Sequence, residues 1–257
     1  MRTLLVIGIG AGDPEQLTVQ AVNALNMVDV FFVFGSEDGS AGRFDARRAV
    51  CERYVRQPRY RMVAVGDPAR DRRAPDYPSA VRDWRDRRAS ALGQAIETEL
   101  PDGGVGAILV WGDPSFYDGT IQTIDTLVRR GQLELDYRVI PGIGSISALA
   151  AKHRITLNQV AGSVHITTAR RLADDPAPGA DDVVVMLNPA STELPIAGLA
   201  DSGDWHIYWG ANLGTAHEAL VSGPLNEVLE HINQVRREHR QRAGWLMDTY
   251  LLRRTLA

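Results

Sequence analysis

The sequence predicts an α/β protein with two α/β domains. Uninterrupted apolar segments such as 30–34 and 107–111 are typical of strands buried on both faces of a sheet. Helical stretches separate these segments, and this alternation favours a parallel sheet. A chain of 257 residues is long enough for two domains. The segment 158–162 predicts the boundary, so we expect an N-terminal domain over 1–158 and a C-terminal domain over 162–257.

The N-terminal domain opens with a strand, a glycine turn and a helix. The strand is predicted over 3–9, and the turn contains Gly8, Gly10 and Gly12. Thr18 is the expected N-cap of the helix, in which apolar residues recur at helical spacing. The elements predicted next are a strand over 30–34, a helix over 44–53, a strand over 60–65 and a helix over 79–100.

The strand predicted over 107–111 ends at a turn rich in polar and aromatic side chains. Gly112 lets the backbone approach another group closely, Asp113 supplies an acceptor, and Pro114 ends the strand by removing a donor. Thr120 is the expected N-cap of a helix over 121–130. Because ligands of open α/β sheets bind at the carboxyl ends of strands, this turn is a candidate ligand loop. Its strand and the opening strand are candidate neighbours in the sheet.

The same design recurs after a strand predicted over 137–140. That strand ends in Pro-Gly-Ile-Gly-Ser, and Ser145 is the expected N-cap of a helix over 146–152. In the C-terminal domain, short strands are predicted over 164–168, 183–187 and 206–209, followed by an amphipathic helix over 225–243. The apolar run 245–252 has no assigned type.

Composition excludes several classes of protein. Apolar residues make up 44% of the chain and charged residues 23%, as in folded globular proteins, and no apolar run approaches the roughly 20 residues that span a bilayer. We expect a cytoplasmic protein. The net charge of −4 argues against nucleic acid as a partner. Cys51 is the only cysteine, and we interpret it as a structural thiol. The histidines lack metal-ligand spacing, so no metal is predicted.

Arginines concentrate in one stretch of the N-terminal domain. Ten of them are Arg56, Arg59, Arg61, Arg70, Arg72, Arg73, Arg82, Arg85, Arg87 and Arg88. Aspartates are interleaved with them, which favours a solvated helix surface with ion pairs. The alternative is that a few of these guanidinium groups bind a polyanionic substrate, since the guanidinium fork pairs well with carboxylates.

The opening glycines do not form a nucleotide fingerprint. The pattern G-x-G-x-x-G needs a third glycine where this chain has Asp13, and no G-K-S/T follows, which excludes a P-loop. The loop is therefore either a tight turn or a ligand-facing loop of another kind. No G-x-S-x-G motif is present, and Ser145 is interpreted as a cap rather than a nucleophile.

Four loops together resemble, in order and spacing, those of the tetrapyrrole methylases. They are 6–18 (VIGIGAGDPEQLT), 111–119 (WGDPSFYDG), 140–145 (IPGIGS) and 208–218 (YWGANLGTAHE). Ala11 departs from the pattern, because most members have proline there. The resemblance implies an S-adenosylmethionine-dependent enzyme whose ligand occupies a cleft between two α/β domains. It also implies that the N-terminal domain carries a substrate trough and that the C-terminal domain completes the cofactor site.

The resemblance also implies which residues contact S-adenosylmethionine. They are Trp111, Gly112, Asp113, Phe116, Gly144, Ser145, Met186, Leu187, Gly210 and Ala211. The runs 82–89 and 244–253 indicate a branch of the family that methylates C-1 of precorrin-5 and releases acetate. Release of the acetyl group requires a base and a proton donor. The candidates for these roles are Tyr117, Asp118, His217 and Asp13.

The expected partner is a small tetrapyrrole, with neither nucleic acid nor membrane involved, and family members commonly form homodimers. The alternatives are another precorrin C-methyltransferase of the same family, or a methyltransferase of the same fold that acts on RNA or protein. A binding protein without catalytic activity is the least favoured hypothesis.

Overall fold

The computed structural model describes residues 1–35, 41–57, 59–69, 76–175, 179–188, 193–201, 204–243 and 246–255. The chain forms two compact units. Unit 1 comprises Met1–Gly10 and Pro14–Ile143, and unit 2 comprises Ala11–Asp13 and Gly144–Ala257. The division therefore falls at residues 143–144, earlier than the expected boundary at 158–162.

Unit 1 contains a five-stranded sheet in the order β3-β2-β4-β1-β5. The strands are β1 (Arg2–Gly8), β2 (Val30–Phe34), β3 (Arg61–Val65), β4 (Val105–Val110) and β5 (Leu135–Ile140). Every pair of neighbours in this sheet is parallel. The parallel sheet is therefore confirmed, and so is the adjacency of the opening strand and the strand that precedes Gly112.

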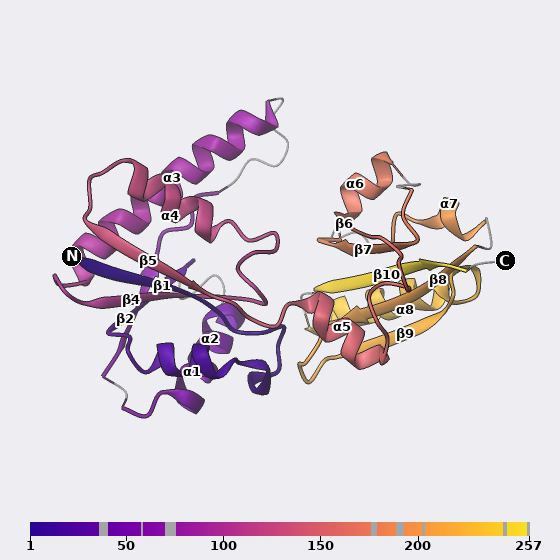
Figure 1. The fold of residues 1–257 in the computed structure, drawn as a ribbon, viewed down its shortest axis with the longest axis horizontal. Helices are drawn as coiled ribbons and strands as arrows, with labels where there is room; N and C mark the ends of the chain where they lie inside the picture. Colours follow the sequence, from indigo (N-terminus) through magenta and orange to yellow (C-terminus); the bar gives the residue numbers. More distant parts are fainter. Residues whose placement is uncertain are drawn as a thin grey trace. The chain divides into compact units, whose positions relative to one another are not determined.

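Helices cover both faces of this sheet (Figure 1). A single turn of 3-10 helix, η1 (Pro14–Gln16), precedes α1. On one face lie α1 (Val19–Leu25) and α2 (Ala41–Tyr54), and on the other lie α3 (Tyr77–Glu99) and α4 (Thr120–Arg129). The helices that follow β1 and β4 thus lie on opposite faces, although the two strands are neighbours. This arrangement creates a topological switch point at the carboxyl ends of β1 and β4, which is where open α/β sheets bind ligands.

The caps of these helices differ in part from expectation. The Thr18 hydroxyl accepts a hydrogen bond from the Ala21 N–H at 3.0 Å and caps α1 as predicted. Thr120 and Ser145 were expected to be N-caps, but Gly119 and Gly144 occupy those positions and neither makes a side-chain cap. Instead, the Asp118 carboxylate accepts from the Thr120 N–H at 2.7 Å, so it satisfies the first turn of α4.

Unit 2 contains a mixed sheet in the order β6-β7-β10-β8-β9. The strands are β6 (Val164–Thr168), β7 (Asp182–Met186), β8 (Trp205–Ala211), β9 (Ala219–Pro224) and β10 (Asp248–Arg254). Only β6 and β7 pair in parallel, and β10 is antiparallel to both of its neighbours. Residues 248–252 of the unassigned apolar run therefore belong to the central strand. Trp245 lies outside the described residues.

The helices of unit 2 are α5 (Ser145–His153), α6 (Ala169–Asp174), α7 (Ala197–Ala200) and α8 (Leu225–Ala243). The α5 helix belongs to this unit because Ile146 and Leu149 pack with Val184 and Leu251 of the sheet. On the other face of the sheet, Ile232 of α8 packs in a separate apolar cluster with Trp209. No helix among the described residues is long and apolar enough to cross a membrane.

Candidate functional site

Three strand ends of unit 1 meet through glycine backbone. A Cβ atom added to Gly142 would lie 2.2 Å from the Gly112 carbonyl oxygen, and one added to Gly8 would lie 2.6 Å from the Gly142 nitrogen. Gly112 has a φ of +72° and exchanges two backbone hydrogen bonds with Gly10. No side chain fits at these contacts, so the loops after β1, β4 and β5 can converge only because the residues are glycines.

Asp113 joins two of these loops. Its Oδ2 accepts from the Gly142 N–H at 2.9 Å, and its Oδ1 accepts from the Ser115 N–H at 2.8 Å and from the Ser115 hydroxyl. Burial acts to raise the pKa of Asp113, but the hydrogen bonds from Ser115 and Gly142 outweigh it and lower that pKa below its ordinary value. Asp113 is therefore an ionised acceptor that fixes the loop, and its geometry is that of a positioning group rather than of a base.

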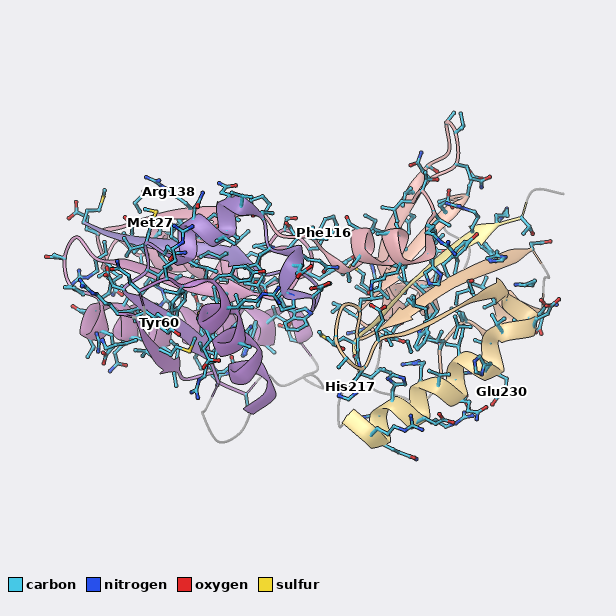
Figure 2. All side chains as sticks on the ribbon, turned by 90° about the horizontal axis from the view of Figure 1, so that it is seen from below. Met27, Tyr60, Phe116, Arg138, His217 and Glu230 are labelled. Carbon is cyan, nitrogen blue, oxygen red and sulfur yellow. The ribbon has the colours of Figure 1, made fainter. Side chains whose placement is uncertain are left out.

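The residues beside Asp113 differ in exposure. Trp111 packs against the apolar cluster beneath α1 and α2. Phe116 and Tyr117 are 43% and 47% exposed, and Figure 2 labels Phe116. Tyr117 has a backbone φ of +51°, a value that residues other than glycine rarely adopt. Exposed aromatic groups on a strained strand-end turn are typical of a ligand loop.

Unit 2 has a similar strand-end loop after β7. Met186 ends the strand and packs against the cluster that contains Leu149. Leu187 follows with a φ of +54° and is 60% exposed. An exposed leucine in the left-handed region costs conformational energy and buries little surface, so folding alone does not account for it.

Two further residues predicted to contact the cofactor lie at the end of β8. Gly210 and Ala211 were expected after a strand over 206–209, but β8 continues through both of them. A Cβ atom at Gly210 would lie 2.7 Å from Leu213 and 2.8 Å from Leu149. Ala211 is fully buried, and its methyl group packs in the apolar core cluster that contains Trp209.

The loop after β8 contacts the segment 11–13 within unit 2. A Cβ atom at Gly12 would lie 2.4 Å from the Leu213 carbonyl oxygen, and one at Gly214 would lie 2.5 Å from the Asp13 nitrogen. Glu218 holds this loop, because its carboxylate accepts from the Gly214 N–H at 2.7 Å and pairs with Lys152 at 3.0 Å. Ala11 is buried in the same region. Its departure from the family's proline therefore occurs at a core position.

Ser145 begins α5, and Gly144 is the N-cap of that helix. The Ser145 Oγ accepts a hydrogen bond from the Thr249 hydroxyl at 3.1 Å. This contact links the first turn of α5 to β10, so the orientation of Ser145 is set by the sheet.

The four candidates for acid–base chemistry fall into two groups. Tyr117 and Asp118 lie side by side in unit 1, and the Asp118 carboxylate caps α4. Asp13 and His217 belong to unit 2, where Asp13 contacts Gly214. His217 is exposed, and Figure 2 labels it. Asp118 thus has a structural task, whereas His217 lies on an exposed loop.

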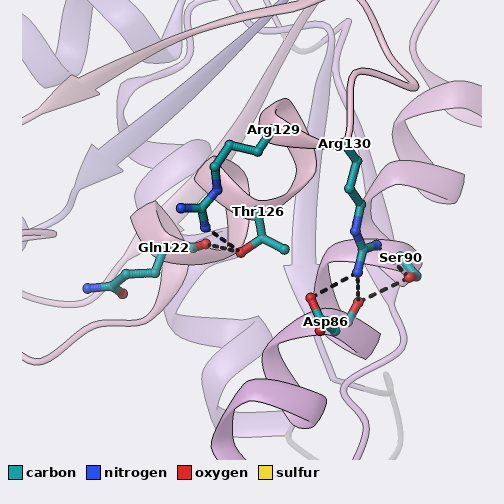
Figure 3. Close-up of polar contacts among 6 residues, drawn as sticks. All are labelled: Asp86, Ser90, Gln122, Thr126, Arg129 and Arg130. Atoms are coloured by element: carbon teal, nitrogen blue, oxygen red, sulfur yellow. Dashed lines mark hydrogen bonds and ion pairs between the residues drawn. The ribbon is translucent and has the colours of Figure 1, made fainter.

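Several of the clustered arginines have partners within the chain. Arg61 pairs with Glu99 at 2.8 Å, and Arg88 pairs with Asp67 at 3.1 Å. Arg88 also stacks on Phe34, with 3.8 Å between its guanidinium carbon and the ring centroid. Outside that stretch, Arg130 at the end of α4 binds Asp86 and Ser90 of α3, as Figure 3 shows. These contacts are those of an ion-paired surface. Arg70, Arg72 and Arg73 lie outside the described residues.

Cys51 is fully buried on α2. Burial, followed by the neighbouring Glu52, raises the pKa of its thiol to about 12. The thiol is therefore un-ionised at neutral pH, which agrees with its interpretation as a structural residue. Within the described part of the chain, no group of three or more His, Cys, Asp and Glu side chains could hold a metal ion.

Sequence reasoning missed the residues that support these loops. Ser115 lies two residues after Asp113, and this spacing is itself a signal for a turn closed by an aspartate side chain. Asp248 and Arg236 form a buried ion pair of 3.2 Å beneath β10. A lone acid in the apolar run 245–252 was its only signal in the sequence.

Comparison with known proteins gives three informative similarities. Residues 3–229 match the family model described as Tetrapyrrole (Corrin/Porphyrin) Methylases. The chain is 41% identical over 254 residues to a precorrin-6A synthase [deacetylating] of Sinorhizobium sp, covering 99% of this chain and 96% of that protein. It superposes on a cobalamin synthesis related protein (CobF) from Corynebacterium diphtheriae with a TM-score of 0.83 and 34% identity, over 98% of each chain.

The fold extends to more distant proteins. A uroporphyrin-III C-methyl transferase from Thermus thermophilus, complexed with S-adenosyl homocysteine, has a TM-score of 0.59 at 17% identity. The match covers 97% of this chain and 91% of that one. At this identity the likeness concerns the fold alone.

Proposed function

Because this chain belongs to the tetrapyrrole (corrin/porphyrin) methylase family, we propose that it methylates C-1 of precorrin-5 with S-adenosylmethionine and releases acetate, giving precorrin-6A. The observation that carries this proposal is the full-length relationship to the Sinorhizobium protein, at 41% identity over 99% of the chain. Similarity over the whole chain includes the strand-end loops as well as the core, and those loops determine which ligand an α/β protein takes.

The proposed cofactor contacts come from strand ends in both units. They are Trp111, Gly112, Asp113, Phe116, Gly144, Ser145, Met186, Leu187, Gly210 and Ala211. Their local structure fits a ligand with polar and apolar parts. Asp113 supplies a carboxylate in the loop after β4, while Phe116 and Leu187 expose apolar surface. When bound, S-adenosylmethionine supplies an electrophilic methyl group on its sulfonium sulfur.

The residues of this chain then have mainly orienting roles. A methyl transfer needs donor and acceptor in line, so rigid loops contribute more than acid–base groups do. The Asp113 contacts to Ser115 and Gly142 supply that rigidity in unit 1. The Glu218 contacts to Gly214 and Lys152 supply it in unit 2.

Release of the acetyl group requires a base and a proton donor near the carbonyl. Tyr117, Asp13 and His217 are the proposed candidates, each on a loop at a strand end. Asp118 is a weaker candidate than these three, because its carboxylate already accepts a hydrogen bond from the Thr120 N–H.

The basic residues of the chain suit a carboxylate-rich tetrapyrrole. Lys152 is the one lysine among 28 basic residues, and the guanidinium groups of the others pair well with carboxylates.

One assay tests the proposal directly. Purified protein is incubated with precorrin-5 and S-adenosylmethionine, and both the product mass and the released acetate are measured. The expected result is one added methyl group and one acetate per turnover. A methylated product without acetate would refute the deacetylating activity and favour another precorrin C-methyltransferase. No methylation of any precorrin would refute the proposal as a whole.

A methyltransferase of the same fold that acts on RNA is the second hypothesis to test. RNA binding would depend strongly on salt, because it releases counterions from phosphates. The net charge of −4 opposes it, so we expect no RNA retention at moderate salt. A binding protein without activity would hold S-adenosylmethionine and leave it unchanged. A cytoplasmic location and a homodimeric state remain predictions.

A further inference from the structure

The start of β10 touches three of the loops proposed to contact the cofactor. The Asp248 carbonyl oxygen accepts from the Asn188 side-chain amide at 3.1 Å, next to Leu187. The Thr249 hydroxyl donates to Ser145. Met247 exchanges two hydrogen bonds with Asn212: its carbonyl oxygen accepts from the Asn212 N–H at 2.8 Å, and its N–H donates to the Asn212 Oδ1 at 3.0 Å.

The strand direction explains this convergence. Because β10 is antiparallel to β7 and β8, its first residue lies beside their carboxyl ends, and Asp248 pairs in register with Ala211. Successive side chains of a strand point to opposite faces. Thr249 therefore reaches α5 on one face, while Asp248 points to the face that α8 covers.

A buried charge pair anchors this end of the strand. The Asp248 Oδ2 accepts from the Trp209 indole N–H at 2.8 Å and lies 3.2 Å from the Arg236 Nε. The Asp248 and Arg236 side chains are 3% and 1% exposed. Burial raises the pKa of Asp248, and Arg236 and the Trp209 indole oppose that rise. Buried ion pairs seldom add net stability, but separating the two partners leaves a buried charge uncompensated, which is strongly unfavourable.

We propose that residues 247–249, anchored by Arg236, form a positioning element that sets the loops at Ser145, 186–188 and 210–212. The inference rests on the proposed cofactor role of those loops. It gives a structural role to part of the segment 244–253. In the sequence, that segment indicated the branch of the family but had no structural explanation. Neither Asp248 nor Arg236 is proposed to touch the cofactor, so neither is a catalytic residue.

The chain offers a matched control at the other end of the same strand. Arg253 pairs with Asp182 at 2.6 Å, and Asp182 is fully buried. Asp248 and Arg253 are separated by five residue steps, or about 17 Å along a strand. Breaking the Asp182–Arg253 pair therefore removes a comparable buried interaction without touching the loops named above.

The experiment compares Asp248→Asn with Asp182→Asn. Amide hydrogen exchange is measured for peptides that cover 186–188 and 210–214, and the Kd for S-adenosylhomocysteine is measured by calorimetry. We expect Asp248→Asn to accelerate exchange in both peptides and to raise the Kd by more than about tenfold. Asp182→Asn is expected to lower the unfolding midpoint similarly, with Kd and loop exchange close to wild type.

A milder variant covers the case in which Asp248→Asn does not fold. Thr249→Val keeps the shape of the side chain and removes the hydrogen bond to Ser145, which corresponds to roughly a two- to tenfold loss of affinity. Equal loop exchange in the Asp248 and Asp182 variants, or wild-type exchange in Asp248→Asn, would overturn the inference. Failure of the wild-type protein to bind S-adenosylhomocysteine would instead refute the proposed cofactor, while the exchange measurements would still decide the positioning role.

Discussion

The Asp113 Oδ2 accepts a hydrogen bond from the Gly142 N–H at 2.9 Å and so joins the loops that follow β4 and β5. These loops are about thirty residues apart in the sequence, and one carboxylate fixes their relative position. The same carboxylate closes its own turn through Ser115.

Asp113→Ala should abolish cofactor binding rather than impair the methyl-transfer step itself. The loss of its hydrogen bonds frees both loops, and we expect the Kd for S-adenosylhomocysteine to rise by more than about tenfold. Asp76→Ala is the control, since Asp76 makes similar contacts to Ser79 at the start of α3 but joins no two strand ends. A variant that binds S-adenosylhomocysteine normally yet fails to transfer methyl groups would reassign Asp113 to catalysis.

The lowered pKa of Asp113 predicts how its contribution to stability depends on pH. A carboxyl group with a pKa below its ordinary value of 3.8 stabilises the fold above that pH, and the contribution is lost as the pH falls through the lowered pKa. The difference in unfolding free energy between wild type and Asp113→Asn should therefore shrink between about pH 6 and about pH 3. Urea unfolding at both pH values measures it. A difference that grows on acidification would contradict the assignment.

Gly142→Ala should be strongly destabilising. Its Cβ atom would lie 2.2 Å from a backbone oxygen that cannot move without shifting β4, and we expect a loss of at least about 2 kcal/mol. Gly66→Ala is the matched control in the same unit, because no atom lies within 4 Å of the added carbon. That variant should change the stability by less than about 0.5 kcal/mol. Similar denaturant midpoints for the two variants would show that the strand ends do not pack as described.

Leu187→Gly should weaken cofactor binding without lowering the thermal stability of the protein. Glycine relieves the left-handed backbone, at φ +54°, by up to about 1 kcal/mol, while the exposed leucine contributes little to the core. We therefore expect unchanged or higher thermal stability and weaker S-adenosylhomocysteine binding. Ala161→Gly, at φ +59°, relieves a similar strain outside the loops and should leave the Kd unchanged. Equal affinity in both variants would remove Leu187 from the proposed contacts.

Cys51 should be unreactive in the folded protein. Its buried thiol has a pKa raised to about 12, so the thiolate is scarce at neutral pH. Because it is the only cysteine, labelling of the whole chain with iodoacetamide reports on this residue alone. We expect no labelling under native conditions and one label per chain in denaturant. Rapid native labelling would refute the interpretation of Cys51 as a structural residue.

The local pattern of apolar runs and turn residues predicted much of unit 1. The apolar run of β2 and the run that ends at Gly112 were expected as buried strands, and the parallel sheet follows from the helices between them. The Gly112–Asp113 turn was recognisable because its signal comes from adjacent residues. The Asp113 contact to Gly142 was not, since it depends on how two distant strands pair.

Unit 2 shows where local pattern is insufficient. Its mixed sheet arises from pairings between distant segments, and the run 245–252 suits a helix or a strand until β7 and β8 flank it. The amphipathic helix α8 was predicted, whereas the edge strand β9 was not. The expected boundary at 158–162 missed that α5 packs on the second sheet, because Ile146 and Leu149 have apolar surface that suits either unit.

The sequence by itself determined the fold class, the family and the loops that we propose to bind the cofactor, because each is encoded in short runs of neighbouring residues. The tertiary structure decided which groups hold those loops in place. It buried the Ala211 methyl group in the core, and it placed Asp248 against Arg236 from a separate helix. Strand register and helix packing set those contacts, and both depend on residues far apart in the chain.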